Sequence, residues 1–206
     1  MTELLLLLAV LAVAAQVRKT REQQARVALL AQYLRPYQIE QQMEALIDGY
    51  LRWLGEADAE RALQIRGVLA GTEQGLAGQF QRFAADVAGM PAPQAQVSKL
   101  PMWIPWAQQL LPRYRMFDVR EAFKIHARGI ADVAANSANL SDKQLARRMM
   151  AELLLMQHTC HWFCRSKAVA DARLVMRHQT AWQQALDTVS PQTARDYREL
   201  LGLPAA

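Results

Sequence analysis

Apolar residues recur every three or four positions through residues 141–189, a stretch that contains neither Gly nor Pro. This spacing indicates amphipathic helix rather than strand. A helix with two apolar faces usually lies at the centre of a bundle, with neighbours on both sides. One stripe comprises Leu145, Met149, Leu153, Met156, Cys160 and Phe163, and a second, more mixed stripe comprises Met150, Leu154, His161, Cys164, Ala168, Ala172 and Val175.

An unbroken helix over this stretch would be about 70 Å long, which exceeds the size of an ordinary small domain. We therefore expect a kink or break near residues 165–167, which read Arg-Ser-Lys. The apolar spacing then continues through Trp182, Leu186 and Val189.

The other helices are predicted from the same spacing together with capping signals. The clearest amphipathic pattern has Ile39, Met43, Leu46, Tyr50 and Trp53 in register. We expect a turn at Gly71, because three glycines interrupt the pattern there. The predicted helices span residues 20–35, 37–54, 59–70, 72–88, 118–136, 142 onward and 191–201, with caps at Asp58, Thr72, Asp118 with Glu121, Ser141 with Gln144, and Ser190, and a stop at Gly202.

No segment alternates apolar and polar residues with period two, so no strand is predicted. Five prolines (91, 93, 101, 105 and 112) exclude a regular helix throughout residues 89–112. We predict an all-α fold, an irregular helical bundle of about six to seven helices. Its parts are a short hydrophobic N-terminal helix (1–17), an N-terminal helical half (18–89), a Pro/Trp-rich connector (90–117) and a C-terminal helical half (118–206).

Residues 4–15 form an apolar run that is followed by the basic residues Arg18, Lys19 and Arg21. The run is shorter than the roughly 20 residues that usually span a bilayer, although a helix over 1–17 would be about 25 Å long and fits a thinned one. We favour a membrane anchor with the remainder in the cytoplasm, since basic flanks stay on that side. A core or interfacial helix and a cleaved signal are alternatives, but the start Met-Thr-Glu lacks the basic region of a signal peptide.

The connector contains the apolar sequence Leu-Pro-Met-Trp-Ile-Pro-Trp, in which Trp103, Ile104 and Trp106 stand out. The interpretation we favour is a plug that covers the helical core. Contact with a membrane interface or with a protein partner is the alternative, because Trp side chains are common at both.

Both cysteines and two of the four histidines lie between residues 158 and 164, namely His158, Cys160, His161 and Cys164. A closed zinc site needs four ligands, and one helix face cannot supply them all. The favoured interpretation is that the thiols are small buried hydrophobes in a reducing compartment. A metal or haem site at these four residues and a reactive thiol are the alternatives.

If residues 118–136 and 142 onward form an antiparallel hairpin, residues whose numbers sum to about 279 face each other. His126 would then lie beside Glu152, and His158 would lie opposite Glu121. The register therefore predicts two contacts between a histidine and a carboxylate, with no third metal ligand.

The net charge of +5 lies in the second half of the chain, since residues 1–100 carry ten basic and ten acidic side chains. Arg120, Lys124 and Arg128 follow one another at four-residue spacing and define a basic face. We interpret it as a solvated face with acidic partners such as Asp118 and Glu121. Anionic lipid or nucleic acid is the alternative, and nucleic acid is not expected because no recognition motif accompanies the charge.

No catalytic motif is present, so we lean against an enzyme. The leading hypothesis is a membrane-anchored helical scaffold, accessory or regulatory subunit that acts through protein–protein contacts. The alternatives are a helical metal- or cofactor-binding protein that uses the His/Cys cluster, with the cofactor unknown, and binding of nucleic acid or anionic lipid through the basic C-terminal half. We expect a membrane to be the main binding partner, and a protein partner or a homo-oligomer is the second possibility.

Overall fold

The chain folds into an all-α helical bundle, which confirms the predicted fold class. The computed structural model describes residues 2–204, which contain ten α-helices, one short 3-10 turn and two three-residue strands. This exceeds the number of helices that the sequence predicts. Two of the extra helices, α4 (Ala92–Ala95) and α5 (Ala107–Leu110), are single turns in the connector.

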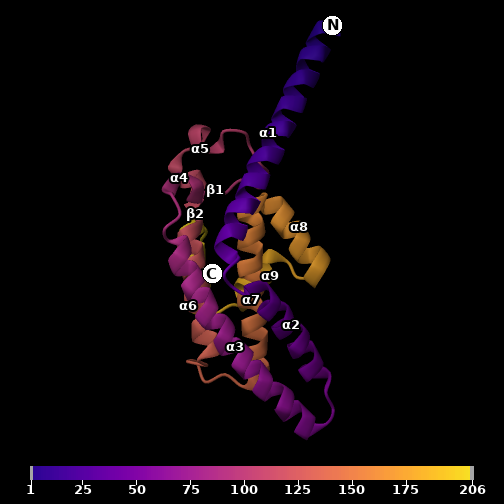
Figure 1. The fold of residues 1–206 in the computed structure, drawn as a ribbon, viewed down its shortest axis with the longest axis vertical. Helices are drawn as coiled ribbons and strands as arrows, with labels where there is room; N and C mark the ends of the chain where they lie inside the picture. The colour runs from indigo at the N-terminus through magenta and orange to yellow at the C-terminus, as the bar shows by residue number, and fades with distance from the viewer. Residues whose placement is uncertain (1, 205–206) are drawn as a thin grey trace.

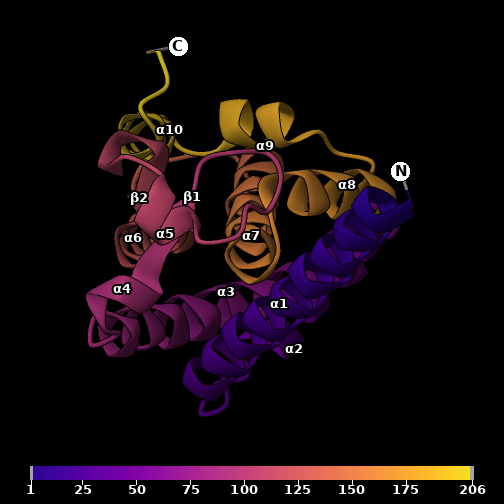
Figure 2. The same cartoon turned by 90° about the horizontal axis from the view of Figure 1, so that it is seen from above.

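Helix α7 (Asp142–Cys164) is the central element, as its two apolar faces predict. It contacts α1, α2, α6, α8 and α9, and Figure 2 shows it between these neighbours. At its start the Ser141 N–H donates to Gln144 Oε1 at 3.1 Å, as expected for a capping box. The helix ends at Cys164, so the predicted break near residues 165–167 is confirmed.

Two short helices follow the break, α8 (Lys167–His178) and α9 (Trp182–Thr188). The apolar spacing that continues to Val189 is therefore divided between two helices. Gln179 adopts a left-handed conformation with φ 51°, which ends α8 and redirects the chain. Helix α10 (Pro191–Leu201) matches the prediction: Ser190 caps its start and Gly202, with φ 68°, ends it.

Helix α1 (Thr2–Leu34) is a single helix in which the apolar run 4–15 is the first half. It passes without a break through residue 17, where the sequence suggested a boundary, and ends before Pro36 as expected. Figure 1 shows its N-terminal half projecting beyond the bundle, while its second half packs on α3 and α7. Arg26 fixes this half by donating to Phe163 O and Gln96 O, both at 3.2 Å.

Helices α2 (Ile39–Gly55) and α3 (Ala59–Val87) form an antiparallel pair. The stripe predicted for α2 is confirmed, and Asp58 Oδ1 accepts from the Arg61 N–H at 2.9 Å to cap α3. The predicted turn at Gly71 is wrong, because α3 continues through it. Each interior Gly costs about 1 kcal/mol, and burial of large apolar side chains such as Leu76 and Phe80 outweighs that cost.

The connector contains a small antiparallel ribbon of β1 (Gln96–Ser98) and β2 (Met116–Asp118), with Val97 opposite Phe117. No strand was predicted here, and the sequence expectation is wrong on this point. Three residues are too few to display an alternating pattern. Trp162 on α7 fixes the ribbon, because its Nε1 donates to Ser98 O at 2.9 Å and its ring meets Phe117 edge-on at 5.0 Å.

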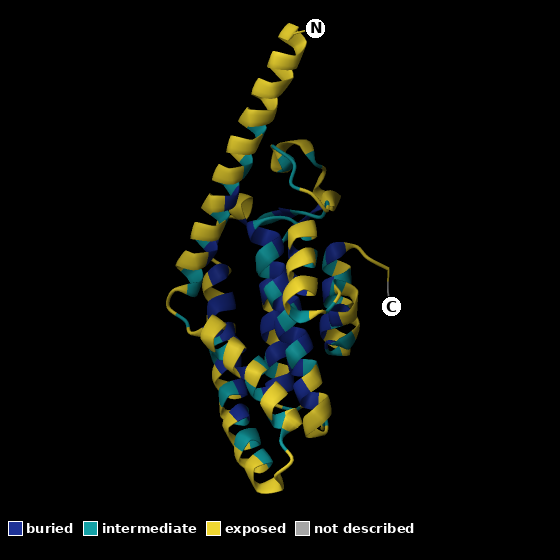
Figure 3. Ribbon diagram, turned by 90° about the vertical axis from the view of Figure 1, so that its right-hand side faces the viewer, coloured by how far each residue is buried: buried dark blue, intermediate teal, exposed yellow. Residues whose placement is uncertain are grey.

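Helix α6 (Val119–Ala134) pairs with α7 and α10 and completes the core, which Figure 3 shows as the dark-blue centre of the bundle. Asp118 caps it by accepting from the Arg120 N–H at 2.9 Å. The reciprocal bond from Glu121 that a capping box requires is replaced by an ion pair with Lys124 at 2.7 Å. The prediction that Asp118 caps this helix is confirmed, whereas the predicted capping box with Glu121 is not.

Gly129 on α6 is expected to be intolerant of a side chain. A Cβ there would lie 2.3 Å from Thr193 Oγ1 and 2.6 Å from Glu152 Oε2, so the Gly129→Ala variant must push α10 or α7 away. We expect its free energy of unfolding to fall by about 1–3 kcal/mol, the usual cost of overpacking. Urea denaturation followed by circular dichroism measures this.

Gly71→Ala is the matched control, because nothing lies within 4 Å of a Cβ at that position. It should raise the free energy of unfolding by up to about 1 kcal/mol through helix propensity alone. Equal changes in the free energy of unfolding of the two variants would contradict the close approach at Gly129.

Candidate functional site

The first half of α1 exposes an apolar surface on every side. Every Leu and Val from Leu4 to Val13 is 54–66% exposed, as the yellow projecting helix in Figure 3 shows. A surface helix normally turns its apolar residues toward one partner. Here no side is covered by the described residues. None of the helices in residues 2–204 combines the length and apolar character needed to cross a membrane.

A basic collar, defined as Arg18, Lys19 and Arg21, follows this apolar segment directly. None of the ion pairs found in residues 2–204 involves a collar residue. The Arg18 guanidinium instead lies 4.5 Å from the centre of the Trp106 ring, a cation–π contact. The collar therefore keeps its positive charge available at the end of the bundle from which α1 projects.

The connector lies at this same end of the bundle (Figure 1). Trp103 and Ile104 are half-buried, whereas Trp106 is exposed on one face and covered by Arg18 on the other. Met102, which belongs to the apolar sequence noted above, is exposed, and so are Leu110 and Tyr114, which no sequence pattern singles out. They are scattered among Gln and Pro and form no periodic pattern, so only the turn geometry reveals them.

The His/Cys cluster is divided among separate partners. His158 Nε2 meets Asp171 Oδ1 at 2.7 Å, and the Arg173 guanidinium meets His161 Nδ1 at 3.1 Å. Cys160 contacts the Met156 sulfur, and burial raises the pKa of both thiols, that of Cys164 to about 11. Within residues 2–204 no three His, Cys, Asp or Glu side chains are placed to hold a metal ion together.

The two contacts between a histidine and a carboxylate that were predicted for the α6–α7 hairpin are replaced by other contacts. His126 Nε2 lies 2.8 Å from Thr159 Oγ1 rather than beside Glu152, and the carboxylate partner of His158 is Asp171 on α8 rather than Glu121. Glu152 instead lies against Gly129, one helical turn from His126, where the missing side chain lets α7 and α10 approach α6. Burial lowers the pKa of His126 to about 3, so the ring is neutral in the core.

The basic face on α6 is paired with acidic side chains, as interpreted from the sequence. Arg120 meets Asp118 at 2.7 Å, Lys124 meets Glu121 at 2.7 Å, and Arg128 meets Asp196 at 2.6 Å. Neutralised charges attract phosphate weakly. This face therefore offers less to an anionic partner than the unpaired collar does.

Comparison with known proteins finds no matching family model, no similar curated protein and no similar solved structure. The surface that carries a function is therefore argued from its own geometry. The exposed apolar half of α1, the collar and the connector lie at one end of the bundle and form the candidate site.

Proposed function

We propose that this chain is a membrane-tethered helical scaffold, accessory or regulatory protein. The apolar start of α1 embeds in a lipid bilayer, and the helical bundle faces the cytoplasm and holds a protein partner at the membrane surface. The observation that carries the proposal is the exposure of the residues from Leu4 to Val13 on all sides. Each such side chain gains about 1.5–3 kcal/mol when it leaves water. Lipid surrounds a helix on every side, as this segment requires.

The position of the collar supports the same arrangement. Residues Leu4–Val17 extend for about 20 Å along the helix axis, somewhat more than the ~15 Å depth of one hydrocarbon leaflet. The collar would then lie at headgroup depth, where Lys and Arg attract anionic lipids. Trp106 and the exposed connector residues lie at the same end, which agrees with the preference of Trp and Tyr for the membrane interface.

The opposite end of the bundle supports contact with a protein. The tip of the α2–α3 hairpin lies farthest from the start of α1 (Figure 1) and carries the exposed apolar side chains Leu51, Leu54, Leu63 and Val68. Exposed apolar side chains at this end are groups that a protein partner could cover. A protein held by one end in a bilayer can thus present its other end to a partner.

The Leu6→Glu/Val10→Glu double variant tests the tether. Both side chains are exposed, so the bundle should remain folded, but charge placed in the apolar segment should abolish flotation with phospholipid vesicles in a density gradient. The wild type should float. Helical content measured by circular dichroism verifies the fold.

Leu63→Glu/Val68→Glu is the matched control, since these residues are also exposed, at 74% and 72%, but lie on the hairpin tip. This variant should float as the wild type does. A wild type that stays at the bottom of the gradient, or an equal loss of flotation in the two double variants, would refute the tether.

A further inference from the structure

A groove of about 1040 Å³ runs between α1 and the connector, below the projecting half of α1. Its α1 wall extends from Ala14 to Gln32, and its other wall is formed by residues 93–94 and 106–109. Ala14, the first of its α1 lining residues, directly follows the exposed apolar segment. The groove is therefore continuous with the surface that the proposed tether buries in lipid.

The charges in the groove favour an anion. Arg18 and Arg21 line it and take part in none of the ion pairs of residues 2–204. Glu22 is the one acidic side chain among the described lining residues, and it pairs with Arg26 at 3.5 Å. The Arg26 guanidinium is occupied by backbone carbonyls of the bundle, so Arg18 and Arg21 remain to bind. Guanidinium groups bind phosphate with two parallel hydrogen bonds.

The apolar part of the groove favours a ligand that also has a hydrophobic part. Val17 and Leu29 line the α1 side, and the Trp106 ring lies under Arg18 on the other. A free phosphate would leave these surfaces in water. A membrane phospholipid satisfies both parts, with its headgroup at the arginines and its acyl chains along the apolar half of α1.

We propose that this groove binds the headgroup of an anionic phospholipid through Arg18 and Arg21, with Trp106 packed against the glycerol region. The proposal rests on the proposed function, because the lipid comes from the bilayer in which α1 is embedded. It goes further by assigning a defined lipid class to a defined site. The protein then distinguishes anionic from zwitterionic membranes.

The test compares full-length protein on vesicles of phosphatidylcholine alone and on vesicles with a minority of phosphatidylglycerol. The wild type should prefer the anionic vesicles by about tenfold or more, and Arg18→Gln/Arg21→Gln should lose most of that preference. Lys143→Gln/Arg147→Gln removes the same amount of charge from the exposed start of α7, and this variant should keep the preference for anionic vesicles. Equal losses in both double variants would overturn the groove as a site.

A second variant fills the groove without changing charge. Ala25 is exposed and lines the groove, so Ala25→Trp should leave the bundle folded and abolish most of the anionic preference. An unchanged preference in this variant would overturn the proposal.

Two further outcomes separate the possible causes. Dihexanoyl phosphatidylglycerol should shift the side-chain N–H resonances of Arg18 and Arg21, whereas inorganic phosphate at the same concentration should not; equal shifts would overturn the lipid assignment. If all variants float on neutral vesicles and none prefers anionic lipid, the groove proposal is wrong but the membrane tether stands. A wild type that floats on neither vesicle would end the proposed function with it.

Discussion

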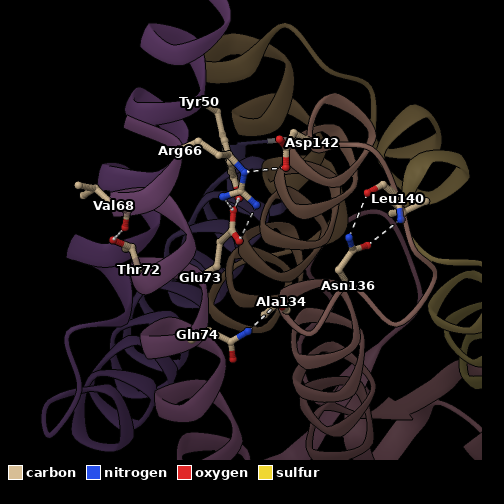
Figure 4. Close-up of polar contacts among 10 residues, drawn as sticks. All are labelled: Tyr50, Arg66, Val68, Thr72, Glu73, Gln74, Ala134, Asn136, Leu140 and Asp142. Carbon is tan, nitrogen blue, oxygen red and sulfur yellow. Dashed lines mark hydrogen bonds and ion pairs between the residues drawn. The ribbon is translucent and has the colours of Figure 1, made fainter. Parts of the chain in front are cut away.

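Replacing Arg66 with Met is expected to lower the free energy of unfolding by about 3–5 kcal/mol, because a buried carboxylate would lose its counter-charge. Glu73 is 2% exposed, and its two oxygens meet the Arg66 guanidinium at 2.9 and 3.2 Å. Tyr50 donates its hydroxyl to the same carboxylate at 2.5 Å. Figure 4 shows this cluster between α2, α3 and the start of α7.

The second contact of Arg66 contributes less to this expectation. Arg66 Nε also reaches Asp142 Oδ1 at 3.1 Å, but the Asp142 side chain is largely in water. Exposed ion pairs contribute at most about 1 kcal/mol. Most of the expected loss of stability therefore comes from Glu73, whose buried charge has no counter-charge once Arg66 is replaced.

Urea denaturation at neutral pH measures the effect, and Arg61→Met on the same helix is the control. The Arg61 side chain is 70% exposed and meets Glu56 at 3.7 Å, so this change should cost no more than about 0.5 kcal/mol. Arg66→Met/Glu73→Leu should recover most of the lost stability, because it removes the unpaired charge. A single Arg66→Met variant as stable as the wild type would contradict the argument.

The sequence predicts the helices of this fold well where an apolar stripe and a cap agree. Local spacing is enough to predict four parts of the fold. They are helix α2, the capped start of α3, α7 up to its break at Arg165, and α10 between Ser190 and Gly202. Caps and stripes are properties of a few neighbouring residues, so a single sequence contains them.

The errors arise where distant residues decide the local structure. Gly71 reads as a turn, but packing of α3 on α2 and α6 keeps it helical. The ribbon at Val97 and Phe117 depends on a pairing across 20 residues and on Trp162, which no local pattern encodes.

The candidate site was predictable in part. The apolar run and the basic collar are contiguous in sequence, so composition alone indicates them. The groove beside them was not predictable, because it needs the connector to return to α1 and place Trp106 beneath Arg18. The left-handed backbone of Trp106, with φ 55°, directs that return, and the sequence gives no Gly or Asn there to signal it.

Glu152 is expected to give the protein a stability that declines as pH rises toward neutrality. The side chain is fully buried between α6, α7 and α10, where the Ser190 N–H donates to Oε1 at 2.9 Å and Oε2 has no hydrogen-bond partner among the described residues. Burial raises the pKa of Glu152 from 4.5 to about 7, and the hydrogen bond from Ser190 opposes that rise only in part. The fold therefore favours the protonated carboxyl.

The direction of the pH effect follows from comparing the folded and unfolded chains. Because the pKa is higher in the folded state, the stabilising contribution is complete below about pH 4.5 and is lost as pH rises to about 7. The shift corresponds to at most about 3 kcal/mol. Burial lowers the pKa of all four histidines, so they act in the opposite direction below about pH 6.5. Wild-type stability alone therefore mixes both effects.

The Glu152→Gln variant isolates the carboxyl, since the amide oxygen can still accept from Ser190 but nothing titrates there. The stability of this variant relative to the wild type should increase between about pH 4.5 and pH 7, by up to about 3 kcal/mol, while the histidine contributions cancel in the difference. Glu60→Gln makes the same chemical change at an exposed position on α3 and serves as the control variant. Urea denaturation across this range measures both, and a flat difference for Glu152→Gln would mean that water or a partner solvates the carboxylate.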